Sequence, residues 1–262
     1  MLHLEPHRLR VPDFIARVEY SQSIDSTNDA ARRLAVEVPP GAGLLVVAEE
    51  QTAGRGRGAN KWWTGAGSLA FSLLFDPSRY AIETRFSCMV PLAAAVAIVD
   101  VVTRRMGTPA VGIRWPNDVY VGERKLAGLL VEVPTVSPAS RAAVVMGLGL
   151  NVNNRLDDAP ADVRRRGAAL VDLGLAPADL TFVLVRLLAR LRGRIDDLIR
   201  QDPQLAADWQ SRCLLRGRTV TLEQGPRTVR GRCLGIEIDG SLALETDRGA
   251  ERFYAGVLTS VE

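Results

Sequence analysis

The hydrophobic periodicity of this chain changes twice along its length, and these changes limit the folds that it can adopt. Up to about residue 151, short apolar runs of strand length alternate with helical patterns. From 162 to 200 the pattern is helical, and residues 218–262 show short alternating strands instead. A chain of 262 residues can bury a large core. We therefore expect an α/β (α+β) fold over residues 1–212, followed by a small β-barrel over residues 213–262.

Individual elements can be placed from local signals. Ser26 to Asp29 have the spacing of a capping box, which predicts that a helix begins there and continues through 30–38. Gly122 and its neighbours predict a hairpin turn, and further turns are expected at 223–226 and 239–240. The remaining predictions are strands at 44–48, 68–75, 110–115, 118–121, 126–133 and 142–150, and helices at 87–106 and 180–200.

Two residue types exclude several classes of chemistry. His3 and His7 are the only histidines, and we expect both to lie in a frayed terminus, which rules out a histidine triad or a histidine-bound zinc. The cysteines Cys88, Cys213 and Cys233 are sparse and odd in number, which predicts reduced thiols in a cytoplasmic protein, with Cys88 in the core.

The distribution of charge and hydropathy bears on location and partners. The net charge is only +3, and arginines are interspersed with acidic residues, so nucleic acid is not an expected partner. Residues 1–14 lack the apolar stretch of a secretion signal. The most apolar run, 89–102, is too short for a membrane span and contains Pro91 and Asp100. We expect a cytoplasmic protein with no membrane partner.

Only two of the 33 lysines and arginines are lysine, and both lie in segments that suggest chemistry. Lys61 belongs to the first segment, 51–63, where Gly54, Gly56 and Gly58 separate Arg55 and Arg57. No acidic residue occurs between 51 and 75, so this loop is suited to a phosphate or a carboxylate. Its spacing is not that of a P-loop. The competing interpretation is an arginine–glycine surface loop that binds RNA or nothing.

The second segment is 114–128. Lys125 is followed directly by Leu126, Ala127 and Gly128, which would let a ligand lie against the backbone of a dry pocket. Asn117 and Asp118 could orient that lysine or bind a nucleotide-bound metal, but they could equally form the turn before a strand.

Two further stretches offer weaker signals. Ser26, Thr27 and Asn28 could hold a polar head group at a helix N-terminus, although capping alone would also explain them. The strand end at 147–151 contains Gly147, Gly149 and Asn151 and suits close ligand approach, and a bulge or turn is the alternative.

Taken together, these four segments resemble the biotin protein ligases. The resemblance rests on 25–28 (DSTN), on Gln51 with 53–57 (AGRGR), on 115–118 (WPND) and on 125–128 (KLAG), in that order. It implies a mixed-sheet catalytic domain of the class II aminoacyl-tRNA synthetase-like, biotin/lipoate ligase type, with an SH3-like C-terminal barrel. Because only about 25 residues precede Ser26, the monofunctional type without a DNA-binding domain or repressor activity is expected.

The resemblance also implies the reaction and its substrates. Biotin and ATP, accompanied by Mg²⁺, would give biotinyl-5'-AMP and pyrophosphate. Biotin would then pass to a lysine of a biotin carboxyl carrier protein, such as a subunit of acetyl-CoA carboxylase. No permanently bound cofactor and no metal ligand are assigned, and exposed sheet edges would allow a homodimer.

The resemblance assigns roles to individual residues. The expected catalytic residues are Lys125, Arg55 and Arg57. Biotin would be bound by Ser26, Thr27, Asn28, Gln51, Arg55, Gly56, Arg57, Lys125 and Gly128. ATP and the adenylate would be bound by Arg57, Trp62, Asn117, Asp118, Lys125, Gly149 and Asn151.

Some positions depart from the family pattern. Ala59 and Asn60 stand where Gly-Arg is usual, so we expect the adenylate to leak faster than it would with an arginine at position 60. Thr64 and Gly65 replace a usual Ser-Pro, and Arg114 replaces a common lysine. Lipoate ligases and octanoyl transferases have a similar architecture and remain a rival interpretation, as does the RNA-binding module.

Overall fold

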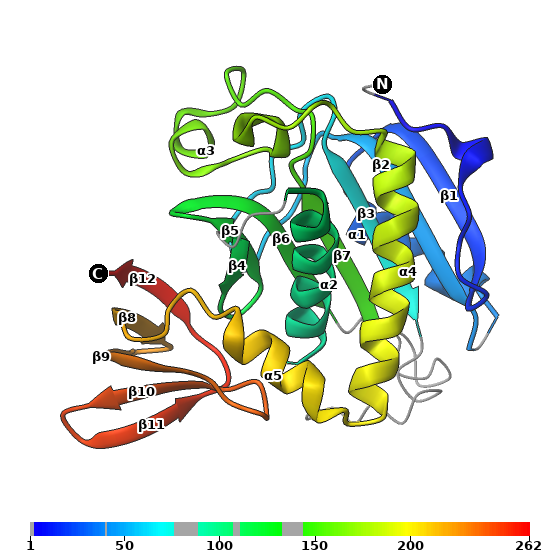
Figure 1. The fold of residues 1–262 in the computed structure, drawn as a ribbon. Helices are drawn as coiled ribbons and strands as arrows, with labels where there is room; N and C mark the ends of the chain where they lie inside the picture. Colours follow the sequence, from blue (N-terminus) through cyan, green and yellow to red (C-terminus); the bar gives the residue numbers. More distant parts are fainter. Residues whose placement is uncertain (1–2, 40, 76–88, 107–110, 133–143) are drawn as a thin grey trace.

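The computed structural model describes residues 3–39, 41–75, 89–106, 111–132 and 144–262. A seven-stranded mixed sheet runs through the N-terminal part (Figure 1). The β1 and β2 strands are parallel, and every other neighbouring pair in this sheet is antiparallel. In spatial order its strands are β1 (Ile15–Ile24), β2 (Gly43–Gln51), β3 (Leu69–Phe75), β7 (Val144–Leu150), β6 (Arg124–Glu132), β5 (Asp118–Val121) and β4 (Val111–Arg114).

Helices cover both faces of this sheet. On one face lie α2 (Met89–Met106) and α4 (Leu180–Ile199), which pack against each other (Figure 1). The opposite face carries α1 (Thr27–Leu34), which packs on β2, β3 and β7. Among the described residues, the remaining helical segments are α3 (Ala161–Arg166), α5 (Pro203–Ser211) and short 3-10 turns at Pro6–Arg8, Ala35–Glu37 and Leu170–Leu173.

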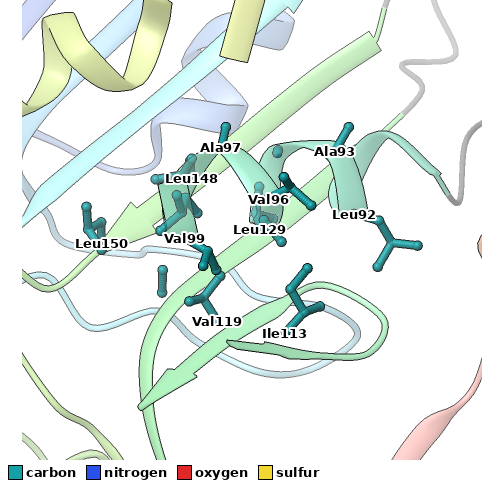
Figure 2. Close-up of a cluster of buried hydrophobic side chains, with 14 of the residues drawn as sticks. Leu92, Ala93, Val96, Ala97, Val99, Ile113, Val119, Leu129, Leu148 and Leu150 are labelled. Carbon is teal, nitrogen blue, oxygen red and sulfur yellow. The ribbon is translucent and has the colours of Figure 1, made fainter. Parts of the chain in front are cut away.

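The side chains of β7 alternate between an apolar face and a glycine face. Met146, Leu148 and Leu150 belong to the buried cluster that α2 and α4 cover. Figure 2 shows Leu148 and Leu150 together with side chains of α2. Successive residues of a strand point to opposite faces, so Gly147 and Gly149 lie on the other side. A Cβ at Gly147 would lie 2.0 Å from Asn28 Oδ1, and one at Gly149 would lie 2.2 Å from the Trp62 ring. The sheet therefore presents bare backbone beside α1.

The predicted start of the first helix is confirmed. Ser26 caps α1, and its hydroxyl accepts the Asp29 backbone N–H at 3.4 Å. Ala30 and Ala31 pack against Leu44 in a second small core on this face. The α-helix ends at Leu34 and continues only as the 3-10 turn, so it is shorter than the predicted 30–38.

A second, five-stranded antiparallel sheet forms from the C-terminal residues. Its order is β11 (Gly249–Phe253), β10 (Leu242–Thr246), β9 (Arg227–Ile236), β8 (Thr219–Gln224) and β12 (Val257–Val261). Gly225 and Gly240 have positive φ of 57° and 79° at the two predicted turns. Within residues 213–262, all of which are described, β11 and β12 remain edges, so the sheet is of the expected kind but the predicted barrel does not close.

The small sheet is fixed against the β4 edge of the large one. The chain after α5 runs along β4, where the Ile113 N–H donates to Arg212 O at 2.8 Å and the Leu214 N–H donates to Ile113 O at 3.0 Å. Two buried indoles, Trp115 after β4 and Trp209 in α5, add bonds to the turn between β9 and β10. Trp115 Nε1 donates to Gly240 O and Trp209 Nε1 donates to Glu237 O, both at 3.0 Å.

Most predicted elements are present, and the differences have local causes. All six predicted strands of the large sheet and the helices α2 and α4 are found, as is the hairpin at Gly122, which has φ of 55°. Neither β1 nor α5 was predicted. The residues of β1 are mostly polar and partly exposed, because it is an edge strand. The prediction for Cys88 lies outside the described residues. Among the helices of the described residues, none has the length and apolar character that crossing a membrane requires.

The expected fraying of the N-terminus is wrong from His3 onward. His3 Nδ1 lies 2.7 Å from Glu49 Oε2, and the Leu4 N–H donates to the same carboxylate at 3.1 Å. The Leu4 side chain is buried in the main core. A carboxylate that engages several donors and a buried leucine together hold this segment on the sheet.

A buried ion network connects α2, α4 and α5. Asp100 lies 2.7 Å from Arg194 and 2.8 Å from Arg212, and Arg194 also lies 2.8 Å from Asp208. The Asp100 side chain is only 10% exposed. Removing one member of a buried network leaves its partners with uncompensated charge.

We predict that Asp100→Ala lowers the free energy of unfolding by about 3 kcal/mol, because two arginines lose their shared partner in a buried site. The matched control is Asp196→Ala, which removes a partly exposed partner of Arg192 within α4 and should cost about 0.5 kcal/mol or less. Urea unfolding followed by circular dichroism measures both. Equal losses in the two variants would contradict the assigned role of Asp100.

Candidate functional site

A cavity of about 780 Å³ opens on the glycine face of the large sheet. Its walls come from the N-terminus of α1, the 51–63 loop, β5, β6, the end of β7, α3 and the C-terminal strand β12. The structure brings every residue predicted for the site to this cavity, although the roles assigned to them stay predictions. They are Ser26, Thr27, Asn28, Gln51, Arg55, Gly56, Arg57, Trp62, Asn117, Asp118, Lys125, Gly128, Gly149 and Asn151.

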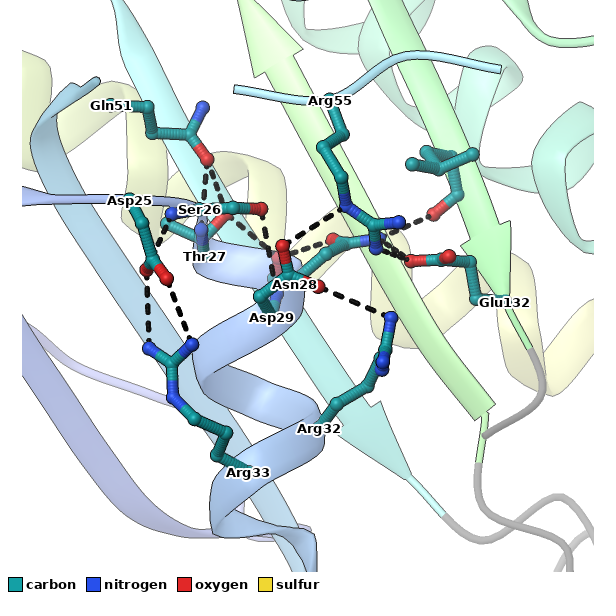
Figure 3. Close-up of polar contacts among 12 residues, drawn as sticks. Asp25, Ser26, Thr27, Asn28, Asp29, Arg32, Arg33, Gln51, Arg55 and Glu132 are labelled. Atoms are coloured by element: carbon teal, nitrogen blue, oxygen red, sulfur yellow. Dashed lines mark hydrogen bonds and ion pairs between the residues drawn. The ribbon is translucent and has the colours of Figure 1, made fainter. Parts of the chain in front are cut away.

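One end of the cavity is a polar network at the start of α1. Gln51 Oε1 accepts the Thr27 backbone N–H at 2.8 Å and its hydroxyl at 3.1 Å (Figure 3). Gln51 Nε2 donates to the Thr64 hydroxyl at 3.2 Å. From β3, the Ser72 hydroxyl lies 2.8 Å from Thr27 Oγ1 and 2.6 Å from Asn28 Oδ1. These bonds hold hydroxyl and amide groups in fixed orientations in a buried place, as recognition of a polar head group requires.

Arg55 is held by two carboxylates rather than left open to solvent. Its Nε lies 3.2 Å from Asp29 Oδ2, and its NH2 contacts Glu132 Oε2 (Figure 3). The same Glu132 oxygen accepts a hydrogen bond from Asn28 Nδ2 at 2.8 Å. Arg55 therefore anchors the loop to both α1 and β6, and Glu132 connects this arginine to the polar network.

The rest of the loop is a small hairpin. The Trp62 N–H donates to Gly54 O at 2.9 Å, and the Gly56 N–H donates to Asn60 O at 2.8 Å. Gly58 has φ of 64°, the left-handed conformation that glycine adopts without strain. Asn60 contributes to the turn, since its Nδ2 donates to Arg57 O at 3.0 Å.

Arg57 connects this hairpin to the C-terminal sheet. Its NH1 donates to the carbonyl of Gly256, just before β12, at 2.6 Å. Residues 256–261 also line the cavity. The C-terminal segment is therefore part of the cavity wall, which the sequence analysis did not predict.

Trp62 covers the glycine floor. Its ring lies directly over Gly149, and the ammonium of Lys125 lies 5.8 Å from its ring centroid. Within the described part of the chain, the buried Trp62 Nε1 has no hydrogen-bond acceptor. Because buried donors are almost always paired, this N–H is a candidate contact for a ligand.

Lys125 is positioned by Asp118 on the neighbouring strand. Its Nζ lies 2.7 Å from Asp118 Oδ1, and a Cβ at Gly128 would come within 3.0 Å of that ammonium. The lysine thus lies along the bare backbone of β6, where a compact point charge can approach a ligand closely. Its side chain is 32% exposed, so the ammonium is accessible from the cavity.

Two predicted site residues use their amides to hold the backbone. Asn117 Nδ2 donates to Leu129 O, and the Leu129 N–H donates to Asn117 O at 3.0 Å, which supports the turn-forming interpretation of Asn117. Asn151 Nδ2 donates to Ala168 O at 3.1 Å. Both residues line the cavity, and these side-chain donors are engaged with the protein itself.

Tyr120 and Arg114 form a further part of the wall. The Arg114 guanidinium lies 4.8 Å from the centroid of the Tyr120 ring. Burial, with the added effect of the Asp118 charge, raises the pKa of Tyr120, so its hydroxyl remains neutral at physiological pH. The Arg114 cation lies over the face of this ring and lines the cavity.

Two contributors that were not predicted from the sequence left a signal in it. Ser72 is the single polar residue of β3, and Glu132 is an acid in an otherwise apolar strand end. A polar residue inside a buried strand requires a partner, so both positions could have been marked. The contribution of 256–261 left no local signal, because it depends on how the two sheets pack.

Comparison with known proteins shows which family has this sequence pattern. Residues 20–151 match the Biotin/lipoate A/B protein ligase family. A Mycobacterium tuberculosis protein named biotin–[acetyl-CoA-carboxylase] ligase is 35% identical over 208 residues, which cover 78% of this chain and 73% of that protein. A Paracoccus denitrificans protein of the same name is 30% identical over 247 residues, covering 88% of this chain and 98% of its own.

A solved structure agrees with the sequence relatives. The biotin protein ligase from Aquifex aeolicus in complex with biotin and ATP superimposes with a TM-score of 0.79 at 25% identity. The match covers 95% of this chain and 99% of that one, so both sheets are included. The family match covers half of the chain, and the two relatives are 30% and 35% identical to it. This chain therefore belongs to the Biotin/lipoate A/B protein ligase family.

Proposed function

We propose that this protein is a biotin–protein ligase, which activates biotin with ATP and transfers it to a lysine of a carrier protein. The observation that carries the proposal is a single cavity that joins two unlike regions. At one end is the polar network around Thr27 and Gln51, and at the other are Lys125 and the glycine floor beneath Trp62. Such a cavity can hold a small acid and a nucleotide side by side.

The polar end matches the ureido group of biotin. That group presents two N–H donors and one carbonyl acceptor, and the Ser26 and Thr27 hydroxyls with the Gln51 amide offer partners of both kinds. The apolar ring and chain of biotin would lie along the bare backbone of Gly128 and its neighbours in β6. The carboxylate would then point toward Lys125.

The cations explain how two anions can react. In the first step a biotin carboxylate oxygen attacks the α-phosphorus of ATP, and the bond to the departing pyrophosphate breaks. Lys125, held by Asp118 at 2.7 Å, stabilises the charge that develops between carboxylate and α-phosphate. We assign Arg57 the adjacent oxygens and Trp62 the exclusion of water from the mixed anhydride. Mg²⁺ enters with ATP as part of the substrate.

In the second step the amine of the acceptor lysine attacks the carbonyl carbon of biotinyl-5'-AMP. An amide bond forms, the amine loses its proton, and AMP leaves with the bonding electrons. We propose a carboxylase carrier subunit as the acceptor, on the basis of the names of the relatives from M. tuberculosis and P. denitrificans.

The proposal is tested by measuring pyrophosphate release from ATP with biotin, lipoate or octanoate as the acid. Release that depends on biotin alone is the expected result. Release that depends on lipoate or octanoate would move the chain to the other branch of its family. Inactivity with all three acids, together with RNA binding that weakens steeply with salt, would support the RNA-binding module instead.

We predict that Lys125→Ala lowers the rate of biotin-dependent pyrophosphate release by a factor of about 100 or more, the scale of one lost charge-stabilising donor. Arg186→Ala is the control, because it removes an exposed cation of α4 that lies outside the cavity walls. Single-turnover kinetics separate this chemical step from product release. Near-normal release by Lys125→Ala would refute the role of this lysine.

Glu132 is predicted to act by positioning Arg55 and Asn28. We expect Glu132→Ala to weaken biotin binding about tenfold or more, because a charged hydrogen-bond partner is lost in a half-buried place. A double-mutant cycle with Arg55→Ala, read by calorimetric titration of biotin, tests the connection. If the double variant is no weaker than the poorer single one, the two residues act together, whereas fully additive losses would contradict this assignment.

The Asn60 position is predicted to affect retention of the intermediate. We expect Asn60→Arg to slow dissociation of biotinyl-5'-AMP, because it adds a cation at the hairpin turn near the phosphate. Asn60→Ala is the control, since both variants lose the bond to Arg57 O. Stopped-flow fluorescence measures the dissociation rates, and equal rates for the two variants would show that the added charge has no effect.

A further inference from the structure

The hydroxyl of Ser72 connects two residues at the polar end of the cavity. Ser72 is fully buried in β3 and does not itself line the cavity. Its oxygen lies 2.6 Å from Asn28 Oδ1 and 2.8 Å from Thr27 Oγ1, and both of these residues line the cavity. Thr27 and Asn28 are only 3% and 4% exposed, so their polar atoms require partners in the protein or in a ligand.

The orientation of the Asn28 amide is fixed by its acceptors. Its Nδ2 donates to Glu132 Oε2 at 2.8 Å and to Leu130 O at 3.4 Å. An ionised carboxylate and a backbone carbonyl can only accept, so the amide nitrogen faces them and the amide oxygen faces Ser72. Arg55 forms an ion pair with the same Glu132 oxygen, which keeps this carboxylate charged.

The direction of each hydroxyl proton follows from this orientation. Asn28 Oδ1 cannot donate, so the single proton of Ser72 fills the 2.6 Å contact between them. The 2.8 Å contact between Ser72 and Thr27 then needs the proton of Thr27. That proton has a second acceptor in Gln51 Oε1 at 3.1 Å, which also belongs to the protein. The Thr27 proton is therefore used inside the protein, and Thr27 Oγ1 meets a ligand only as an acceptor.

We propose that Ser72 makes Thr27 a hydrogen-bond acceptor, so that this end of the cavity selects a head group that presents an N–H there. The inference rests on the proposed function, which places the ureido group of biotin at this end. A ureido N–H donates to Thr27 Oγ1. The dithiolane of lipoate and the alkyl end of octanoate have no N–H, so they leave this buried oxygen unpaired. Ser72 acts through Thr27 and is a positioning residue.

Two neighbouring groups supply donors for the ureido carbonyl. Ser26 Oγ accepts the Asp29 N–H, and Gln51 Nε2 uses one of its two protons on the Thr64 hydroxyl. One proton on each of Ser26 and Gln51 remains for a ligand carbonyl. Together with the acceptor at Thr27, these donors match the carbonyl and one N–H of a ureido group.

The test compares biotin with the two cyclic carbamates in which one or the other ureido N–H is replaced by oxygen. Calorimetric titration gives the affinity of each compound for the natural protein, Ser72→Ala and Ser68→Ala. We expect the natural protein to bind one carbamate at least about 100-fold more weakly than biotin, because two sets of lone pairs then meet in a buried place. In Ser72→Ala the Thr27 hydroxyl can turn and donate to the ring oxygen, so this ratio should shrink about tenfold.

The ratio separates positioning from a general loss of packing, because a packing defect weakens both ligands alike. Ser68→Ala is the matched control, since Ser68 is also buried beside β3 and its hydroxyl donates to Gly65 O at 2.8 Å. It should keep the ratio of the natural protein. An unchanged ratio in Ser72→Ala would overturn the inference, as would equal affinity of the natural protein for biotin and both carbamates. No binding of biotin would refute the proposed function, and this inference with it.

Glu132→Gln tests the same chain of hydrogen bonds from its other end. An amide at this position can donate as well as accept, so the Asn28 amide is free to turn over and to donate to Ser72. Ser72 could then donate to Thr27, and the Thr27 proton would become available to the ligand. We expect the ratio between biotin and the rejected carbamate to shrink as in Ser72→Ala. A ratio equal to that of the natural protein would contradict the direction assigned to the chain.

Discussion

The alternation of side chains along β7 is the constraint on which the rest of the molecule depends. One face of that strand carries Met146, Leu148 and Leu150, which the helices α2 and α4 bury. The other face carries Gly147 and Gly149, so the same seven residues form both the core and the cavity floor. A one-residue shift in register would exchange these faces and destroy both.

Acidic residues then determine where the cations of the cavity lie. Asp118 holds Lys125, while Asp29 and Glu132 hold Arg55. Each long side chain is ordered before a ligand arrives, so less conformational entropy is lost on binding, and the charges point where a negative charge would develop. The polar network at Thr27 and Asn28 is connected to this system through Glu132. The cavity is thus organised by ion pairs on top of a rigid apolar sheet.

The sequence predicted the parts of the fold and site that depend on local patterns. Strands such as β3 and β7 have continuous apolar runs, and the cap at Ser26 is a local signal. The cavity residues were found because they occur in short motifs with a known order. The partly exposed edge strand β1 was missed, because its polar residues hide the strand period.

Features that depend on tertiary packing could not be predicted in this way. The bond between Arg57 and Gly256 joins residues far apart in the sequence, and no local pattern marks either end. For Asn117 and Asn151, the motifs predicted ligand contacts but not a structural role. In the structure, their side-chain amides hold the backbone.

The most direct test of this account is calorimetric titration of biotinyl-5'-AMP into the natural protein, Gly149→Ala and Gly193→Ala. A Cβ at Gly149 would collide with Trp62 at 2.2 Å, whereas one at Gly193 in α4 would meet no atom within 4 Å. We expect Gly149→Ala to bind about tenfold more weakly or worse, a loss of about 1.4 kcal/mol, and Gly193→Ala to bind like the natural protein. Equal affinities in all three proteins would contradict the claim that the glycine floor beneath Trp62 is the binding site.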